Sequence, residues 1–291
     1  MCIYTYCSLN MGVENMNYQA ATMDPVEVDL KFPPITESFT INVKGDNLLS
    51  MMYIAQGEGP HPTVILCHGF PGSEKNIDLA QALRRAGYNV LIFHYRGCWG
   101  SQGTYSVKHD LEDTEAVIDF LRSDNCNKTY RVDPKNLILM GYSLGGFNAL
   151  ITLSNHPEIN SMAFLVGYNF GRYAKGLYGN DKLIKEAEEF WSGSFPPLRG
   201  ITKEQFLQEI IENREKWDLV DYAEKLQGHK LLFVGGKRDT VADIKNHYQP
   251  VVDVLKKNNL NDLTEVILDT DHDCSCKRIA LSETLIEWLS K

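Results

Sequence analysis

Three residues of the sequence, Ser143, Asp239 and His272, could together activate a hydroxyl group for attack on a carbonyl carbon. Ser143 stands in Gly-Tyr-Ser-Leu-Gly at 141–145, where the glycines permit a sharp turn that presents the serine. A neutral imidazole at His272 would accept the serine proton and return it to the leaving group. A carboxylate at Asp239 would fix the imidazole tautomer and stabilise the cation. These residue types predict a serine hydrolase.

The positions of the three residues along the chain support this interpretation. Each follows an apolar stretch typical of a buried strand, and these stretches are 136–140, 231–234 and 265–268. The carboxyl ends of parallel strands meet at one edge of a sheet, where active sites of this fold class collect. The order serine, aspartate, histidine is also the order expected for a serine on a strand-to-helix turn. We therefore expect the three side chains to converge.

Strand and helix patterns alternate along most of the chain. A hairpin is predicted over 37–44 and 48–55, around Gly45-Asp46. Further strands are predicted at 63–67, 89–95 and 162–166, and helices at 75–86, 107–122, 144–154, 244–257 and 277–290. Continuously apolar strands separated by helices predict an α/β fold with a doubly wound, mostly parallel sheet of about eight strands.

The alternation is interrupted between residues 167 and 228, where helical periodicity at 182–191 and 203–217 predicts a helical cap insertion. The first 34 residues lack apolar periodicity, which predicts a poorly ordered or loosely attached extension. The expected organisation is an N-terminal extension at 1–34, an α/β core at 35–166 and 229–291, and the cap at 167–228.

The predicted cap is rich in aromatic residues that could line a substrate pocket over Ser143. The candidates for this pocket are Tyr142, Phe170, Tyr173, Trp191 and Phe195. Large aromatics are also common core residues, so many of the cap rings could instead pack the cap onto the core. Acidic residues of the same segment could bind a substrate amine or simply form a solvated helix face; they are Glu186, Glu188, Glu189 and Glu209.

An oxyanion formed during attack needs preorganised N–H donors. Leu144, directly after the serine, should supply one from a helix N-terminus. The second should come from Phe70 in the His68–Gly72 loop, because Pro71 has no N–H. We expect His68 to be a hydrogen-bonded scaffold for this loop rather than a catalytic base.

Several alternatives compete with these assignments. Asp243 could replace Asp239, and His247 could replace His272 less readily because it lies inside a predicted helix. A zinc site at His272, Cys274 and Cys276 lacks a fourth ligand at a usual spacing. No metal and no cofactor are therefore expected.

Composition restricts the partners and the compartment. The net charge of −9 and the lack of a basic block argue against nucleic acid, which needs a clustered basic face. No apolar run reaches the roughly 18 residues of a membrane span, and the first 30 residues lack the pattern of a signal peptide. The seven cysteines are interpreted as reduced thiols. We expect a cytoplasmic monomer or homodimer that takes a small-molecule ester or a short peptide and binds no membrane.

Taken together, these motifs resemble the α/β-hydrolase family. The resemblance runs from about residue 35 to the C-terminus and is carried by residues 68–72, 95–97 with Gly100 and Gly103, 141–146, 238–239 and 271–272. It is closest to prolyl-oligopeptidase-like and serine-aminopeptidase-like hydrolases. It implies a metal-free Ser-His-Asp hydrolase. The sequence departs from the subgroup at Cys274, where an aromatic is frequent, and in a cap of no recognisable type.

The sequence thus predicts a serine hydrolase that cleaves a small or medium carboxylic ester through an acyl-enzyme. A peptidase or amidase of the serine-aminopeptidase type is an alternative, since amide cleavage uses the same triad. A non-catalytic binding protein that keeps the fold is a second alternative.

Overall fold

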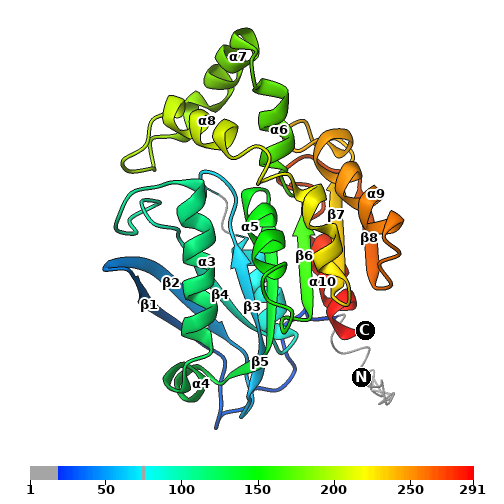
Figure 1. The fold of residues 1–291 in the computed structure, drawn as a ribbon. Coiled ribbons are helices and arrows are strands. Elements are labelled where there is room, and N and C mark those ends of the chain that lie inside the picture. Colours follow the sequence, from blue (N-terminus) through cyan, green and yellow to red (C-terminus); the bar gives the residue numbers. More distant parts are fainter. Residues whose placement is uncertain (1–18, 74–75) are drawn as a thin grey trace, which may run out of the picture.

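The computed structural model describes residues 19–73 and 76–291, and its centre is an eight-stranded sheet (Figure 1). The strand order is β1-β2-β4-β3-β5-β6-β7-β8. The strands are β1 (Ile35–Val43), β2 (Asp46–Ile54), β3 (His61–Cys67), β4 (Asn89–Phe93), β5 (Val132–Tyr142), β6 (Ser161–Leu165), β7 (Lys230–Gly236) and β8 (Leu263–Leu268). β1 and β2 form an antiparallel hairpin, β2 is antiparallel to β4, and the pairs from β4 to β8 are parallel.

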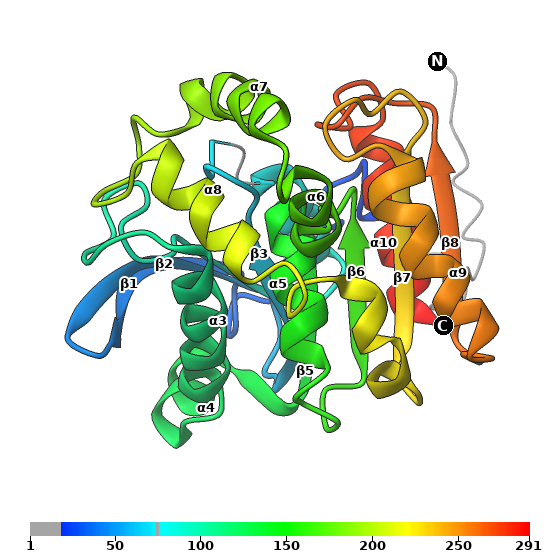
Figure 2. The ribbon, with the colours of Figure 1, turned by 45° about the horizontal axis from the view of Figure 1, so that its top comes forward.

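Helices cover both faces of the sheet, as a largely parallel sheet requires. α3, α5 and α9 pack on one face, and α2 and α10 pack on the other (Figures 1 and 2). The helices are α2 (Ile77–Arg85), α3 (Val107–Leu121), α4 (Asp124–Tyr130), α5 (Leu144–Leu153), α6 (Phe170–Leu177), α7 (Asp181–Trp191), α8 (Lys203–Glu212), α9 (Gln249–Lys257) and α10 (Arg278–Ser290). The expected fold class is confirmed. Across residues 19–73 and 76–291, no helix is both long and apolar enough to cross a membrane.

Two helices differ from the sequence prediction for local reasons. The helix expected over 244–257 begins with a π-turn at Ile244–Tyr248 before α9. Pro250 has no N–H for an ordinary helical bond, which accounts for the break. The helix expected over 203–217 ends as α8 at Glu212, where the Asn213 side chain donates to the Glu209 carbonyl at 2.8 Å. α4 was not predicted.

The predicted N-terminal extension lies partly outside the described residues, which begin at residue 19. Within its described part, Ala20 is buried, and the Arg85 guanidinium donates to the carbonyl of Ala20 at 2.7 Å. The Ala20 and Ala21 carbonyls thus hold the start of the described stretch against α2. A poorly ordered extension over residues 1–34 stays a prediction.

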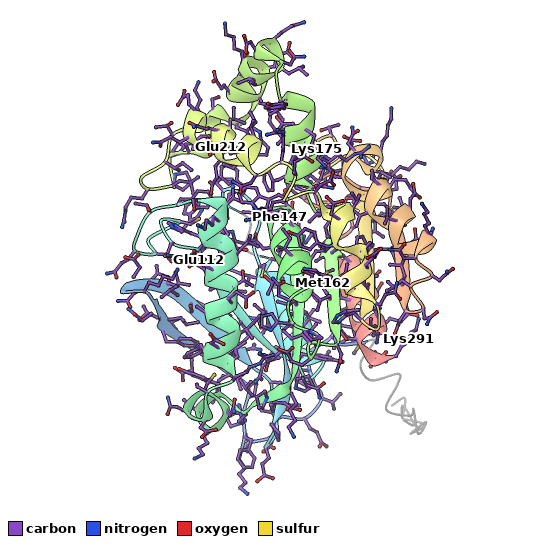
Figure 3. The ribbon with its side chains drawn as sticks, in the orientation of Figure 1. Glu112, Phe147, Met162, Lys175, Glu212 and Lys291 are labelled. Atoms are coloured by element: carbon purple, nitrogen blue, oxygen red, sulfur yellow. The ribbon has the colours of Figure 1, made fainter. Side chains whose placement is uncertain are left out.

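The helices α6, α7 and α8 of the 167–228 segment lie above the carboxyl ends of the parallel strands (Figure 1). Phe147, at the upper end of α5, contacts this segment (Figure 3). Its ring lies 5.4 Å from that of Phe170 and 5.6 Å from that of Trp217, measured between centroids. The Lys175 ammonium, on α6, donates to the buried Asp218 carboxylate at 2.9 Å. The Phe147 contacts dock the segment on the core, whereas the Lys175–Asp218 contact lies within the segment. The role of the segment as a cap stays a prediction.

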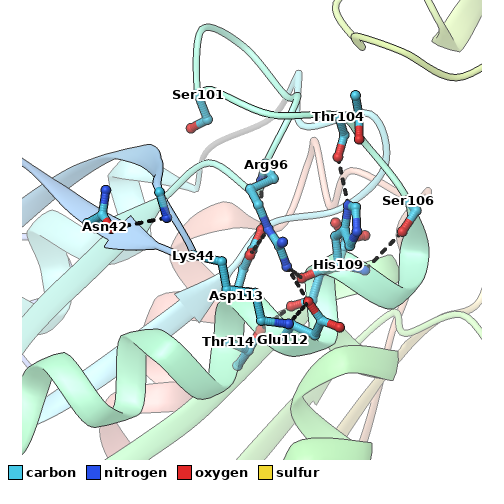
Figure 4. A network of polar contacts seen from close by, with 12 residues as sticks. Asn42, Lys44, Arg96, Ser101, Thr104, Ser106, His109, Glu112, Asp113 and Thr114 are labelled. Carbon is cyan, nitrogen blue, oxygen red and sulfur yellow. Dashed lines mark hydrogen bonds and ion pairs between the residues drawn. The ribbon is translucent and has the colours of Figure 1, made fainter.

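A buried ion-pair network holds the loop that follows β4 (Figure 4). The Arg96 guanidinium, 5% exposed, pairs with Asp113 and with Glu112, both on α3. The Asp113 carboxylate also accepts the Arg96 backbone N–H at 2.7 Å. The same loop pairs with the 167–228 segment, because the Arg199 N–H donates to the Gly97 carbonyl at 2.8 Å. The network therefore connects α3, through one loop, to the helices above the sheet.

Replacing Asp113 by alanine should destabilise the fold strongly, because the Arg96 charge would remain buried without its main partner. We expect the free energy of unfolding in urea to fall by about 3–5 kcal/mol. Lys44→Ala is the matched control, since it removes only the exposed contact of Lys44 with Glu112 and should cost less than about 1 kcal/mol. Equal stability of the two variants would show that the Arg96 pair contributes little.

Candidate active site

Ser143 stands on a strained turn between β5 and α5. Its backbone angles are φ 54° and ψ −117°, in the left-handed region that few non-glycine residues adopt. A Cβ at Gly141 would lie 1.9 Å from the Gly145 carbonyl oxygen, and a Cβ at Gly145 would lie 2.0 Å from the Cys67 carbonyl oxygen. Only glycine fits at these two positions. The motif therefore has the tight geometry that the sequence predicts.

The structure brings Ser143, His272 and Asp239 together. The His272 Nδ1 lies 2.8 Å from the Asp239 Oδ2, and its Nε2 lies 3.0 Å from the Ser143 Oγ. The carboxylate can only accept, so Nδ1 carries the proton and donates it to Asp239. Nε2 is then left to accept the hydrogen of the Ser143 hydroxyl. The Asp239 side chain is fully buried and that of His272 is 16% exposed.

Asp239, rather than Asp243, is the carboxylate that faces the imidazole. The second oxygen of Asp239 accepts the N–H groups of Val241 and Ala242, each at 2.8 Å, so the carboxylate is held on both sides. Asp243 instead accepts the Asn246 N–H at 3.0 Å and caps the π-turn. The alternative assignment to Asp243 finds no geometric support.

The loop that carries His272 is fixed by Tyr142. The Tyr142 hydroxyl lies 2.9 Å from both the His272 carbonyl and the Asp273 carboxylate, toward which it donates. The Arg278 guanidinium holds the next turn by donating to the Asp273 carbonyl at 3.1 Å. The sequence prediction placed Tyr142 in the substrate pocket, which needs correction. Its side chain is buried and acts as a positioning group for the histidine loop.

The two candidate oxyanion donors follow neighbouring strands, and their role stays a prediction. Leu144 is the first residue of α5, and Phe70 lies in the loop after β3, the strand that neighbours β5. The His68 Nδ1 donates to the Gly69 carbonyl at 2.7 Å, the scaffold contact expected of it. The Phe70 ring stacks on that of Phe206 in α8, with centroids 4.7 Å apart.

A pocket of about 530 Å³ opens between the 167–228 segment and the loop after Asp239. Its walls carry aromatic, aliphatic and charged side chains: Tyr168, Arg172, Tyr173, Gly176, Leu177, Leu183, Glu186, Ala187, Phe190, Thr240, Val241, Asp243, Asn246 and His247. The pocket adjoins the site on two sides. The Tyr168 N–H donates to the Ser143 carbonyl at 3.0 Å, and Thr240 directly follows Asp239.

Of the predicted pocket residues, only Tyr173 lines this pocket. Phe170, Trp191 and Phe195 instead belong to a ring cluster that packs the 167–228 segment onto the core. The rings of Trp191 and Phe195 lie 5.4 and 5.7 Å from that of Phe70. Burial explains this arrangement, because large aromatic side chains contribute the most hydrophobic stabilisation when they are enclosed. The cluster contacts the loop that carries the Phe70 N–H.

The glutamates and cysteines named in the sequence analysis lie in different parts of the structure. Glu209 accepts the N–H groups of Val107 and Lys108 at the start of α3, whereas Glu186 lines the pocket. Cys274 is buried in the hydrophobic core, and Cys276 is exposed beside Arg238.

Sequence reasoning missed His247 as a pocket residue. The Asn169 N–H donates to its Nδ1 at 3.1 Å, so the ring proton is on Nε2. The ring packs on that of Tyr168 with centroids 3.9 Å apart. Burial lowers the pKa of His247 to about 4, which keeps it neutral near pH 7. The helical pattern around His247 does not indicate that its side chain faces the pocket, because that orientation depends on the π-turn.

Comparison with known proteins identifies the family of the chain. A family model described as "alpha/beta hydrolase fold" matches residues 62–208, which is half of the chain. The chain belongs to this family. The uncharacterized protein YfhR of Escherichia coli O157:H7 is 30% identical over 147 residues, 49% of this chain and 50% of that protein. The chain therefore matches only about half the length of that relative.

Solved α/β-hydrolase-like structures extend the similarity across the sheet. The acylaminoacyl peptidase of Pyrococcus horikoshii gives a TM-score of 0.65 at 16% identity, covering 90% of this chain and 42% of that one. The Pyrococcus furiosus esterase Pf2001 gives a TM-score of 0.60 at 19% identity, covering 92% of this chain and 98% of that one. At such identities the similarity shows the fold alone.

Asp239→Asn should lower the reactivity of Ser143 by about 10³- to 10⁴-fold, because an amide cannot hold the imidazole as a carboxylate does. The measurement is the rate of covalent labelling by a fluorophosphonate probe. Asp243→Asn is the matched control and should label within about threefold of wild type, since Asp243 caps a turn at the pocket wall and does not bond to His272. If Asp243→Asn were the variant that fails, the carboxylate role would belong to Asp243.

Proposed function

We propose that this chain is a serine hydrolase that cleaves a small or medium carboxylic ester through an acyl-enzyme. The observation that carries the proposal is the continuous hydrogen-bond chain from the Ser143 hydroxyl through His272 to Asp239. Membership of the α/β-hydrolase family supports a hydrolase in general. The triad assignment, the ester substrate and the cap are the parts that the proposal adds.

In the acylation step the Ser143 Oγ attacks the ester carbonyl carbon while the His272 Nε2 takes the hydroxyl proton. The buried Asp239 carboxylate stabilises the imidazolium that results. The carbonyl oxygen becomes negative and accepts the N–H groups of Phe70 and Leu144. Collapse of this intermediate breaks the bond to the alcohol, which leaves with the proton from His272.

In the deacylation step a water molecule attacks the acyl-serine, and His272 takes one of its protons. The second tetrahedral intermediate collapses, the proton returns to the Ser143 oxygen, and the carboxylic acid leaves. The enzyme is regenerated without a change of oxidation state. Ser143 is only 7% exposed, which restricts its contact with bulk water.

The pocket between α6, α7 and the loop after Asp239 supports a substrate of modest size. Its volume of about 530 Å³ lies in the range that small-molecule sites occupy. Tyr168 and Tyr173 supply aromatic walls, and His247 supplies a neutral N–H donor at the same wall. We assign this pocket to the acyl or alcohol group of the ester.

A peptidase is the second candidate, and one observation favours it. Glu186 and Asp243 both line the pocket, and their carboxylates could hold a substrate amine. Comparing p-nitrophenyl esters with aminoacyl anilides separates the two reactions. Anilide turnover without a preference for the ester would identify the amidase.

Ser143→Ala should abolish labelling by a fluorophosphonate probe and lower ester turnover by roughly 10⁴- to 10⁶-fold, because the nucleophile is lost. Ser275→Ala is the matched control, since Ser275 is an exposed serine three residues from His272. Its labelling and turnover should match wild type. Turnover by Ser143→Ala at the wild-type rate would refute the mechanism, and a wild-type protein that does not label would favour the non-catalytic binding protein.

His247→Phe should weaken the binding of esters that carry a hydrogen-bond acceptor beyond the scissile carbonyl. Loss of one neutral hydrogen bond predicts a KM higher by about 2- to 10-fold for a methoxy- or keto-acyl ester, with kcat nearly unchanged. The KM for the matching alkyl ester should not change. His247→Gln keeps both a donor and an acceptor and should restore the wild-type KM. A fall in kcat as large as that of Ser143→Ala would give His247 a catalytic role instead.

His247 should also affect the stability of the fold at acid pH. Its pKa is about 4 when folded and near 6.5 when unfolded, so unfolding takes up a proton between these values. The neutral ring therefore contributes to the free energy of unfolding above pH 6.5, and this contribution is lost as the pH falls to 4. The loss amounts to at most about 3 kcal/mol. Urea unfolding of wild type and His247→Gln over this range should give a shallower pH dependence for the variant.

A further inference from the structure

A second cluster of reactive side chains lies in the loops that follow β3 and β4, outside the proposed triad. His68 directly follows β3, and His94 directly follows β4, the parallel neighbour of β3. Cys98 comes from the same loop as His94. One ligand atom from each of the three side chains lies within 4.8 Å of the other two. None of the three takes part in the proposed reaction through its side chain.

Two imidazoles and one thiol form a donor set suited to zinc. Zn²⁺ binds imidazole nitrogen at about 2.0–2.1 Å and thiolate sulfur at about 2.3 Å, usually with tetrahedral geometry. These bond lengths would place the three ligand atoms about 3.3–3.6 Å apart. Reaching that spacing from within 4.8 Å requires shifts of about 1 Å or less for each side chain. Two histidines and a cysteine leave a fourth position open for water.

The hydrogen bond that His68 makes through Nδ1 selects the tautomer that a metal ligand needs. Its Nδ1 donates to the Gly69 carbonyl at 2.7 Å, so Nε2 is the unprotonated nitrogen of the neutral ring. A backbone carbonyl on the second ring nitrogen is a common outer contact of metal-binding histidines. The Tyr95 ring lies against the imidazole, with centroids 4.4 Å apart, and restricts its rotation.

An ion can reach this cluster through a separate pocket. The pocket has a volume of about 390 Å³ and is lined by His68, His94 and Trp99, together with apolar side chains of β2 and β4. Cys98 is fully buried. The thiol therefore lies on the inner side of the cluster, and the partly exposed His94 lies on the outer side.

We propose that His68, His94 and Cys98 bind one Zn²⁺ ion. On binding, the Cys98 thiol gives its proton to solvent and the thiolate sulfur bonds to the metal. The thiol now donates to the Pro71 carbonyl at 3.1 Å, and this contact ends when its proton leaves. The Pro71 carbonyl then keeps the contact from the Trp99 indole N–H, at 2.8 Å, and loses the one from Cys98. Because Pro71 directly follows Phe70, occupation of the site would loosen the loop that carries a proposed oxyanion donor.

The binding test uses Zn²⁺ in competition with a chromophoric chelator and Co²⁺ as a spectroscopic probe. Wild type should bind one Zn²⁺ and give a thiolate-to-cobalt charge-transfer band. Cys98→Ser should lose the band, and both Cys98→Ser and His94→Gln should bind Zn²⁺ at least about 10-fold more weakly. Thermal unfolding followed by circular dichroism checks that each variant folds. If Cys98→Ser does not fold, His94→Gln, whose side chain is partly exposed, carries the test.

Cys276→Ser is the matched control because Cys276 is the exposed thiol of the described residues and lies beside Arg238. It should keep the wild-type band and affinity. A wild-type protein without a cobalt band, or a band lost in Cys276→Ser but kept in Cys98→Ser, would overturn the proposed site.

The effect of the ion on catalysis rests on the proposed function. Zn²⁺ should slow ester turnover by wild type and leave Cys98→Ser unaffected. Bound Zn²⁺ with unchanged wild-type turnover would overturn the link to the Phe70 loop. A wild-type protein that turns over no ester would contradict the proposed function, while chelator competition would still decide whether the metal site exists.

Discussion

The contact between the Gly145 position and the Cys67 carbonyl is the constraint on which the candidate site depends. With no side chain at Gly145, α5 starts directly against the end of β3, and Gly141 packs on the same turn. This close approach leaves Ser143 with a positive φ and raises its hydroxyl above the sheet. It also places the first N–H of α5 beside the loop after β3. One steric condition thus positions both the proposed nucleophile and the two proposed oxyanion donors.

The remaining groups reach the serine through loops that are each held by a different kind of contact. Two backbone N–H groups hold the Asp239 carboxylate, and the Tyr142 hydroxyl holds the His272 loop. The Phe70 loop is held by hydrogen bonds to the Gly69 and Pro71 carbonyls and by rings that pack on Phe70, which include that of Phe206 in α8. The helices above the sheet therefore contact the site through the oxyanion loop as well as through the pocket wall. A substitution in the ring cluster would act on the reaction indirectly, through the position of Phe70.

The fold and the central residues were predictable because they depend on local patterns. An apolar strand followed by a polar residue places Ser143, Asp239 and His272 at one sheet edge, whatever the details of packing. The pocket was not predictable in the same way. Phe170 and Trp191 have the residue types of a pocket wall, yet burial draws them into the ring cluster. The orientation of His247 depends on a π-turn before Pro250, and no pattern of the chain encodes where that turn directs a side chain.

Two histidines near the candidate site show how a single contact determines what an imidazole can do. Nδ1 of His272 donates to a carboxylate, which leaves Nε2 as the nitrogen that can accept the Ser143 proton. Nδ1 of His247 faces the Asn169 N–H, which can be accommodated only while that nitrogen is unprotonated. Burial acts in the same direction and lowers the pKa of His247. The identity of the residue is the same, but one ring is arranged to exchange a proton and the other to remain neutral and donate a hydrogen bond.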